Sequence, residues 1–511
     1  MAKTLPAHLR RSAALLRFLD EEKATAEVVW RGVSLGKWGS LNPSHRLDAK
    51  GIRLVLRPPS GNLVFRISTA RHSPQGIEIR LLKCAEQPAA GNLDLIWRQR
   101  DGEFRADVST AQLQEWLTRW VRNLSPGCRI MSAGKSSDRA HTLSGAYFRI
   151  HGRGMKRDFI LLASYQECKV GENHQSALSQ ALLWVSLLKR KRCLCGKPQV
   201  HILVPHGFTG IIRHRAGLLD QSTIDIEVWQ SEASATDGLS VRHAPLPVPP
   251  AENREFRWPV LGPFHWNAGL ARVLDLAPGY IKRYPRFQEY DSLRLWGLEF
   301  AIARGETRDC ISFGVGPDKT DLNADNFESL RALVEGILYY RRADSPDPYH
   351  PFYRLQAERW LESLILEDVP NLFPELVPAS VYPQIPVYLG KDPGRVDILG
   401  ADREGTLAIL ELKVAPDPDL PIQALDYWGR VVRHNADGDF RRRGYFSGIC
   451  LNASRPRIYL VSPVFSFHDS TEQVVRFFNP GVEVWKIAIN EDWRSGVKIL
   501  RRTQLGCGDQ Q

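Results

Sequence analysis

The sequence predicts a mixed α/β protein in which two similar domains, each a mixed central sheet flanked by helices, follow one another along the chain. Residues 350 to 490 carry patterns in the order helix, three strands, helix, strand. Residues 106 to 235 carry similar patterns in the same order. Two Pro-rich segments separate the parts of the chain, HAPLPVPPAEN at residues 243 to 253 and RRADSPDPYHP before the last domain.

Two further domains are expected outside this repeat. Residues 1 to 105 contain the strand-like runs IRLVLRPP, LVFRIS and IEIRLLK, which predict a β-rich N-terminal domain. Residues 254 to 345 contain the apolar runs of LRLWGLEFAIA and the helical pattern FESLRALVEGILYYRR, which predict a small α+β accessory domain. Neither part contains a motif that indicates a chemical function.

The last domain, residues 346 to 511, is predicted element by element. AERWLESLI has the apolar spacing of an amphipathic helix, and VYPQIPVYLG is typical of a strand. VDIL and TLAILELKV are two short β-rich segments joined by DREG, whose Asp and Gly favour a hairpin turn. PIQALDYWGRVVR predicts the next helix, and RPRIYLVSPVF predicts the last strand of this pattern.

Three charged residues are expected to converge in this hairpin. Glu411 and Lys413 lie two residues apart, so both side chains leave the same face of their strand, and the neighbouring strand brings Asp397 beside them. Two carboxylates and one ammonium in an apolar hairpin are costly to desolvate unless a partner compensates them. Mg²⁺, which prefers oxygen ligands, is the favoured partner, and Mn²⁺ is expected to substitute for it.

The segment with this hairpin resembles the core of the PD-(D/E)XK nuclease superfamily, and closely its archaeal and bacterial NucS-type and RecB-like branches. The resemblance covers about residues 350 to 490, and the motif hairpin and the QALDYW helix are its most specific parts. It implies a restriction-endonuclease-like core that hydrolyses phosphodiester bonds. A surface hairpin with an ordinary ion pair is the alternative interpretation of the same residues.

The resemblance also implies roles for individual residues. Asp397, Glu411 and the carbonyl of Leu412 would hold Mg²⁺, and Lys413 would orient the attacking water or stabilise the charge on the phosphoryl group. Gln423 would hold Lys413 or a phosphate, with Tyr427 one helical turn away as a nucleic-acid contact. Several branches of the family add an acid from the first helix as a further metal ligand. Glu358 is the candidate for that acid, and Glu362 is the other.

Residues 106 to 242 form the predicted first copy of the same fold, and its site is expected to be degenerate. Alignment of the repeat matches Arg149 with Asp397, and Gln114 with Glu358. Glu167, Lys169 and Gln180 match Glu411, Lys413 and Gln423, in that order. An Arg in place of a metal carboxylate puts a cation where a cation should bind, so this copy is expected not to hold Mg²⁺. Arg149 and Lys169 are instead candidates for contacts with a phosphate. Asp158 could supply an acid only in another register.

The charge of the chain favours a polyanionic partner. The 511 residues carry a formal net charge of +11 at pH 7 and have a sequence pI of about 9.3, which promotes binding to nucleic acid through counterion release. Two basic patches are candidate phosphate contacts: Arg441, Arg442 and Arg443 after the QALDYW helix, and Lys189, Arg190, Lys191 and Arg192 in the first copy.

No run of about 18 apolar residues is present, so no membrane span is expected, and the N-terminus lacks the core and cleavage site of a signal peptide. The eight cysteines are scattered, as is typical of reduced thiols, which predicts a cytoplasmic protein. Cys193 and Cys195 have no second pair at zinc-finger spacing, so no zinc site is expected.

The sequence therefore predicts a Mg²⁺-dependent nuclease, an endonuclease or another phosphodiester hydrolase, with DNA as the favoured substrate and a role in bacterial defence, repair or mobile-element biology. An RNase is an alternative, because no residue pattern distinguishes a 2′-hydroxyl. A catalytically silent nucleic-acid-binding protein is a second alternative, and an assembly or regulatory protein is a third. Assembly into a homo-oligomer is left open.

Overall fold

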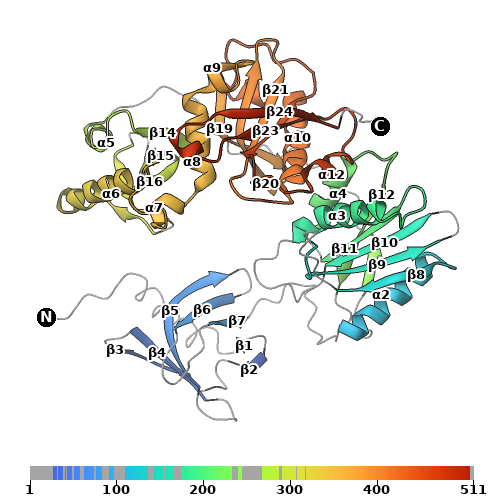
Figure 1. The fold of residues 1–511 in the computed structure, drawn as a ribbon. Helices are drawn as coiled ribbons and strands as arrows, with labels where there is room; N and C mark the ends of the chain where they lie inside the picture. Colours follow the sequence, from blue (N-terminus) through green and yellow to red (C-terminus); the bar gives the residue numbers. More distant parts are fainter. Residues whose placement is uncertain are drawn as a thin grey trace. The chain divides into compact units, whose positions relative to one another are not determined.

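A computed structural model of the chain describes residues 27–96, 110–135, 143–164, 174–232, 240–243 and 267–506, with short gaps in the first, third, fourth and last of these ranges. Figure 1 gives the element labels used below. The chain divides into two compact units, Met1–Asp107 with Glu232–Ser240, and Val108–Ser231 with Val241–Gln511. Each unit is described by itself.

The first unit contains a seven-stranded antiparallel sheet with the order β2-β1-β7-β6-β5-β4-β3. Alternation in β4 buries Ile52 and Leu54 on one face, where they pair across the ladder with Ile67 and Phe65 of β5. The β-rich character expected for residues 1 to 105 is confirmed for the described strands. These are β1 (Glu27–Trp30), β2 (Val33–Lys37), β3 (Ser44–Asp48), β4 (Gly51–Leu56), β5 (Leu63–Ser73), β6 (Gly76–Leu82) and β7 (Gly91–Ile96).

The second unit opens with an α/β fold that we call the first fold. Its sheet has the order β13-β12-β11-β10-β9-β8. The central strand β10 is buried along its whole length, as expected of a strand covered on both faces. The elements are α2 (Thr110–Leu124), β8 (Arg129–Gly134), β9 (Tyr147–Arg153), β10 (Asp158–Ser164), the 3₁₀ helix η3 (His174–Ser176), α3 (Ala177–Arg190), β11 (Gln199–Pro205), α4 (Thr209–Gly217), β12 (Asp225–Glu232) and β13 (Ser240–His243).

A second α/β fold occupies the C-terminal part of this unit, and we call it the second fold. Its six-stranded sheet has the order β19-β20-β21-β22-β23-β24. The elements are α8 (Ala357–Glu367), α9 (Val369–Leu372), β19 (Leu376–Leu389), β20 (Asp392–Asp402), β21 (Leu407–Leu412), α10 (Leu420–Ala436), α11 (Asp439–Arg442), β22 (Arg457–Pro463), α12 (Thr471–Val475), β23 (Glu483–Ile489), η5 (Trp493–Ser495) and β24 (Ile499–Leu505). The helices and strands expected between residues 357 and 463 are all present in the expected order.

The structure of the β20–β21 turn explains why the sequence DREG contains Asp402 and Gly405. Asp402 accepts a hydrogen bond from the Thr406 amide at 2.7 Å. Gly405 has a φ of +84°, and a Cβ at this position would lie 2.0 Å from the carbonyl oxygen of Cys450. Both the left-handed backbone and the close approach require glycine. The hairpin predicted from the turn residues is confirmed.

The two folds have the same pattern of strand directions. In the first fold β8 and β9, and β9 and β10, are antiparallel, whereas β10, β11 and β12 are parallel. In the second fold β19 and β20, and β20 and β21, are antiparallel, whereas β21, β22 and β23 are parallel. The helices also follow at corresponding points, so that α2, α3 and α4 correspond to α8, α10 and α12. Both folds are mixed α/β, as expected.

A small α+β fold lies between them in the sequence. Its antiparallel sheet has the order β14-β15-β16-β17-β18, and α6 packs on it through Leu330, Val334 and Ile337. Its elements are α5 (Ala268–Leu274), β14 (Ile281–Arg286), β15 (Tyr290–Leu295), β16 (Leu298–Arg304), β17 (Cys310–Phe313), β18 (Thr320–Asp321), η4 (Ala324–Asn326) and α6 (Phe327–Tyr340), and α7 (Pro351–Arg354) leads to α8. The accessory α+β character expected for this part is confirmed for residues 267 to 340.

The accessory fold holds the start of α8 in place. Gly297, in the β15–β16 turn, lies so close to α8 that a Cβ there would be 1.9 Å from the carbonyl oxygen of Arg359. The fully buried Arg341 donates to the carbonyls of Trp296 at 3.0 Å and Gln356 at 3.1 Å. Its pKa is lowered to about 9 by burial and by the neighbouring charge of Arg494. The chain therefore enters α8 at a fixed angle, which matters because α8 contributes to the site described next.

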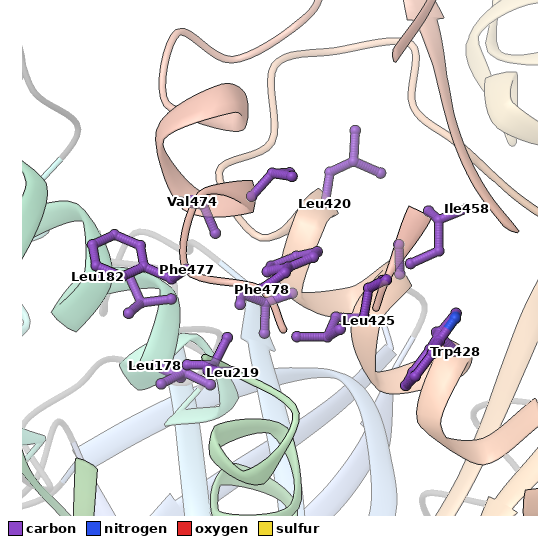
Figure 2. Packing of buried hydrophobic residues seen from close by; sticks show 14 of the residues in the cluster. Leu178, Leu182, Leu219, Leu420, Leu425, Trp428, Ile458, Val474, Phe477 and Phe478 are labelled. Atoms are coloured by element: carbon purple, nitrogen blue, oxygen red, sulfur yellow. The ribbon is translucent and has the colours of Figure 1, made fainter. Parts of the chain in front are cut away.

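The first and second folds share one hydrophobic core. Figure 2 shows Leu178, Leu182 and Leu219 of the first fold packed toward Leu425 and Phe478 of the second. Helix α3 contacts α12, and α4 contacts α10. The boundary between these two folds is thus a packed interior rather than a linker.

Candidate active site

The candidate site lies on three adjacent strands of the second fold. The β19–β20 ladder sets Gln384 opposite Asp397, and the β20–β21 ladder, continued by one residue, sets Asp397 opposite Glu411. The backbone amide of Leu412 donates a hydrogen bond to Asp397 Oδ2 at 3.0 Å. The convergence of the two acids expected from the hairpin is therefore present, with Asp397 on β20 opposite the end of β21.

Glu411 is almost completely buried, with 1 % of its surface exposed. Its Oε2 atom has no hydrogen-bond partner among the described residues. A buried carboxylate oxygen without a partner costs free energy. Burial and the charge of Asp397 raise the pKa of Glu411 well above its usual range. Ionisation of this carboxyl group is therefore costly, and a bound proton or cation would lower that cost.

Asp397 is less enclosed, with 14 % of its side chain exposed. Burial raises the pKa of Asp397, although the charge of Arg359, the Leu412 amide and the charge of Lys413 act in the opposite direction. The two acids therefore disfavour each other's ionised form, which is the arrangement expected of paired carboxylates in a functional site.

Lys413 follows directly after β21 and completes the group. Its Nζ atom lies 3.4 Å from Asp417 Oδ2. Burial lowers the pKa of Lys413, but the carboxylates of Glu411, Asp417 and Asp397 together raise it above its usual value. Lys413 is therefore a permanent cation at the mouth of the site, with 21 % of its side chain exposed.

Gln423 and Tyr427 approach the site from the first two turns of α10. The Gln423 side-chain amide donates to the Tyr427 hydroxyl at 3.1 Å. Burial, and after it the charge of Glu411, raises the pKa of Tyr427, so its hydroxyl faces the acid cluster as a neutral group. The expectation that Gln423 lies on the helix face next to Lys413 and Glu411 fits this arrangement, but its direct partner is Tyr427.

Helix α8 contributes Arg359, which the sequence reasoning missed. Its Nη1 atom lies 3.3 Å from Asp397 Oδ1 and 2.7 Å from Glu362 Oε2. Gln384 was also missed: its side-chain amide donates to Asp397 Oδ1 at 3.2 Å and to Glu362. Gln384 has a φ of +59°, an uncommon backbone state for a non-glycine residue. Neither residue belongs to a sequence motif. The β19–β20 ladder places Gln384 beside Asp397, and the position of Arg359 on α8 places it there.

The two candidate acids of α8 differ in their surroundings. Glu362 is buried and already bound by Arg359 and Gln384, with Arg294 of the accessory fold 3.7 Å away. Beside the larger effects of burial and Arg359, the charge of Glu358 contributes to the raised pKa of Asp397, and Glu358 also acts on Lys413. Glu358 therefore acts on the cluster through its charge, while Glu362 contacts the two residues that bind Asp397, Arg359 and Gln384.

The basic patches lie away from the cluster. Arg441 and Arg442 are exposed beyond the C-terminal end of α10, whereas Gln423 lies in the first turn of this helix. From Gln423 to its C-terminal end the helix is about 20 Å long. Arg442 is paired with Asp439. Lys189 lies in the last turn of α3, over the ring of Phe477, with 4.8 Å to the centroid. These side chains do not contribute to the acid cluster.

The first fold carries no comparable cluster in its described residues. The β9–β10 ladder pairs Arg149 with Leu162, so Leu162 occupies the position of Glu411 and Ser164 that of Lys413. Glu167 and Lys169 lie outside the described residues. The match of Glu167 with Glu411 is therefore wrong in register. The spacing along the chain differs: 12 residues (165–176) separate β10 from α3 and 7 (413–419) separate β21 from α10, and the difference of 5 equals the offset between residues 162 and 167.

Four more residues named in the sequence analysis lie in the described part of the first fold. Arg149 is buried and donates to the Ser144 carbonyl, so the expected phosphate contact at Arg149 does not fit its enclosure. Gln180 accepts a hydrogen bond from the Ser144 amide at 2.9 Å, and Gln114 is exposed on α2. Asp158 is fully buried at the other end of β10, where Arg153 and the Cys195 amide bind it.

A polar pocket of about 180 Å³ adjoins the site between the two folds. Tyr427 and Gln423 form one side of it, and Gln175 and Arg215 of the first fold form the other. Arg215 Nη2 bonds Asp426 Oδ2 at 3.1 Å, and Arg430 bonds the same carboxylate at 2.9 Å. Gln423 and Tyr427 therefore lie between the acid cluster and a pocket that both folds line.

The donor set suits a hard divalent cation. Mg²⁺ commonly binds one or two carboxylates and keeps several waters, and Asp397 with the unpartnered oxygen of Glu411 provides such a pair. No group of three His, Cys, Asp or Glu side chains suited to a metal occurs among the described residues. Two protein carboxylates, with Glu358 nearby, are thus the available ligands.

No known protein family matches the chain, and no curated protein is similar to it in sequence. In the part of the chain that the structure describes, none of the helices is both long and apolar enough to cross a membrane.

Proposed function

We propose that this protein is a metal-dependent nuclease that hydrolyses phosphodiester bonds in nucleic acid, with DNA as the favoured substrate, and that its core is a PD-(D/E)XK fold. The observation that carries the proposal is the pair Asp397 and Glu411, set opposite each other with a buried carboxylate oxygen that lacks a partner, and Lys413 two residues further on. The matching strand directions of the first fold support the proposal that it is a second copy without the acids.

The proposed chemistry assigns each residue a task. Asp397 and Glu411, with the Leu412 carbonyl and Glu358 as further candidates, would hold Mg²⁺, which when bound polarises the phosphate and lowers the pKa of a water. Lys413, cationic before reaction, would face the charge that develops on the phosphoryl oxygens. The water oxygen forms a bond to phosphorus, one P–O ester bond breaks, and the leaving oxygen takes a proton. Gln423 and Tyr427 would orient the substrate beside this point.

The surroundings of the two acids support distinct roles for Arg359 and Gln384. Both donate to Asp397 Oδ1, while the Leu412 amide holds Oδ2. A carboxylate fixed at both oxygens keeps its orientation, which a metal ligand needs. Glu362 in turn accepts hydrogen bonds from Arg359 and Gln384. These residues are positioning residues, because they act through Asp397.

A catalytically silent nucleic-acid-binding protein is the second candidate. The observation in its favour is the guanidinium of Arg359, 3.3 Å from Asp397, which partly neutralises the cluster without a metal. This candidate leaves the Glu411 oxygen without a partner, and Lys413 without a task. We therefore place it second.

The test is incubation of the purified chain with labelled single-stranded and double-stranded DNA and RNA in Mg²⁺, Mn²⁺ or EDTA. We expect cleavage with either metal and none with EDTA. Asp397→Ala and Glu411→Ala should each abolish cleavage and preserve folding and most of the binding. Glu404→Ala, an exposed acid in the turn of the same hairpin, is the matched control and should cut normally. Unchanged turnover in either site variant would remove the assignment of the site.

A further inference from the structure

The contacts between the first and second folds have the form that an internal two-fold axis produces, and one of them is an antiparallel bridge. Leu219 and Phe478 form an isolated antiparallel bridge. The Asp220 amide donates to the Phe477 carbonyl at 2.8 Å, and the Asn479 amide donates to the Leu218 carbonyl at 3.2 Å. One segment follows α4 and the other follows α12, which are corresponding helices. An antiparallel pair of corresponding segments is what a two-fold axis produces.

A second contact lies on the same axis. Ser176 and Asp419 are the N-cap residues of the corresponding helices α3 and α10, and the Ser176 hydroxyl donates to the Asp419 carboxylate. The helix pairs exchange in the same way, since α3 contacts α12 as α10 contacts α4. Each surface therefore meets its own counterpart, as in an isologous dimer.

The contact around the axis is a true interior. Apolar side chains from both folds form one buried cluster, part of which Figure 2 shows. A Cβ at Gly429 of α10 would lie 2.8 Å from Leu218 Cδ1 and 3.0 Å from His214 Nε2, so the two helices approach closely. Asp426 is buried between Arg215 and Arg430. The face through which a second copy would pair is thus filled within one chain.

The strand end that carries the site in the second fold, and its counterpart in the first fold, each precede a helix that begins at this axis. Strand β10 leads into α3 and β21 into α10, and the N-termini of these two helices meet at Ser176 and Asp419. In the second fold this end carries Glu411 and Lys413. In the first fold the corresponding ladder positions are Leu162 and Ser164. The pocket between the folds has residues of each fold in its lining, among them Ser176 and Asp419.

From this geometry we propose that the substrate is a DNA duplex lying across the internal two-fold axis, of which one strand is cut per encounter. The inference rests on the proposed nuclease function. The two strands of a duplex are antiparallel and related by two-fold axes, so a two-fold protein meets them through corresponding surfaces. The strand at the second fold meets the acid pair. The strand at the first fold finds no carboxylate at the corresponding ladder positions, which the buried Leu162 and Ser164 occupy, so the product is a nick.

The symmetry also separates binding from cutting. Both folds contribute to the contact with the duplex, and the chain's net charge of +11 favours that contact. Among the described residues, only the second fold supplies the carboxylate pair that is proposed to act on a phosphate. A single chain therefore suffices for binding and for the nick, and a double-strand break requires a second, independent encounter.

The test uses the full chain, a negatively supercoiled plasmid and Mg²⁺. We expect the open circular form as the first product, at a rate proportional to protein concentration, with the linear form appearing only after a lag. Glu411→Ala should lose nicking completely and keep binding to the duplex, whereas Glu404→Ala should nick like the wild type. Labels on either strand of a linear duplex should report one cut strand per bound chain.

Several results would overturn the inference and leave the nuclease proposal intact. These are direct conversion of supercoiled plasmid to linear form, a rate that rises with the square of protein concentration, or cleavage of single strands or RNA without cleavage of a duplex. Absence of metal-dependent cleavage on every substrate, by a folded wild-type chain, would instead contradict the nuclease proposal itself. The two failures are therefore distinguishable.

Discussion

At the scale of single residues, Glu411 carries the clearest sign of function. Its carboxyl group lies buried beside Asp397, and its raised pKa means that the folded protein keeps a proton which the unfolded chain releases. An unfolded glutamate ionises near pH 4.5. Between that pH and the raised pKa, the folded state therefore loses stability as the pH rises. A cation bound at the pair would offset this loss.

Glu411→Gln should for this reason stabilise the metal-free protein and abolish its cleavage. The amide keeps the shape of the side chain and cannot ionise. Each unit of pKa shift corresponds to about 1.4 kcal/mol, so we expect the thermal midpoint of this unit to rise by a few degrees at pH 8, with no difference from wild type near pH 4. Differential scanning calorimetry with EDTA measures this effect.

The same experiment with Mg²⁺ supplies the control. Wild type should gain stability from the metal and Glu411→Gln should not, because the ligand is lost. Glu404→Gln, on the exposed turn, should follow the wild type throughout. A Glu411→Gln variant that is less stable than wild type at pH 8, or that Mg²⁺ protects equally, would contradict the account of the buried pair.

Lys413 makes a separate prediction, because its proposed task lies in the transition state. Lys413→Ala should lower the cleavage rate by on the order of 10²-fold or more with little change in affinity for nucleic acid. Lys413→Arg keeps the charge but changes its shape, so it should retain an intermediate rate. Single-turnover kinetics and a binding titration separate the two quantities. A variant that cuts at the wild-type rate but binds weakly would make Lys413 a phosphate clamp.

At the scale of elements, the order of helices and strands in the second fold could be predicted, because apolar spacing and turn residues are local signals. The β20–β21 hairpin is an example: DREG and the alternation in TLAILELKV determine it. The support around Asp397 could not be predicted. Arg359 is one surface residue of an amphipathic helix, and only the fixed angle of α8 brings it to the acid.

The support that β19 gives to Asp397 through Gln384 can be tested by substitution. Gln384→Glu keeps the size of the side chain but replaces the amide donor with a carboxylate beside Asp397 and Glu362. We expect a loss of about 10- to 100-fold in apparent Mg²⁺ affinity or in rate, as for other supports of a metal ligand. Activity measured over a range of Mg²⁺ concentrations gives this result.

Gln384→Gly separates positioning from folding. Glycine accepts the φ of +59° without strain, which offsets part of the cost of removing the buried side chain, and the variant lacks the amide. It should need more Mg²⁺ for half-maximal rate than wild type. A normal Mg²⁺ requirement in both variants, with stable folds, would show that Gln384 supports only the backbone.

At the scale of the whole molecule, repeated patterns in the sequence predicted two related α/β folds, and the matching strand directions agree with that expectation. The sequence alignment of the two folds put Glu167 in the wrong register. The segment between β10 and α3 is five residues longer than the segment between β21 and α10, and the alignment followed the similarity of the two helices. The packing of the two folds against each other could not be predicted from the sequence, because contacts such as Leu219 with Phe478 join segments far apart in the chain.

The asymmetry of the two folds gives the last prediction. Glu167→Ala should cut near the wild-type rate, because the ladder position that matches Glu411 in the first fold is Leu162. The equivalent change in the second fold, Glu411→Ala, should remove cleavage. Weaker binding of Glu167→Ala, with a shallower salt dependence, remains compatible with the prediction, since a phosphate contact is a separate property.

A metal count provides independent evidence on the same point. A crystal soaked with Mn²⁺ should contain one anomalous peak, between Asp397 and Glu411, and none beside Arg149, whose cationic side chain repels a metal ion. Loss of catalysis in a folded Glu167→Ala protein, or a second Mn²⁺ position in the first fold, would mean that both folds take part in one composite centre. The account of a single cutting site would then fail, and with it the expectation of one nick per encounter.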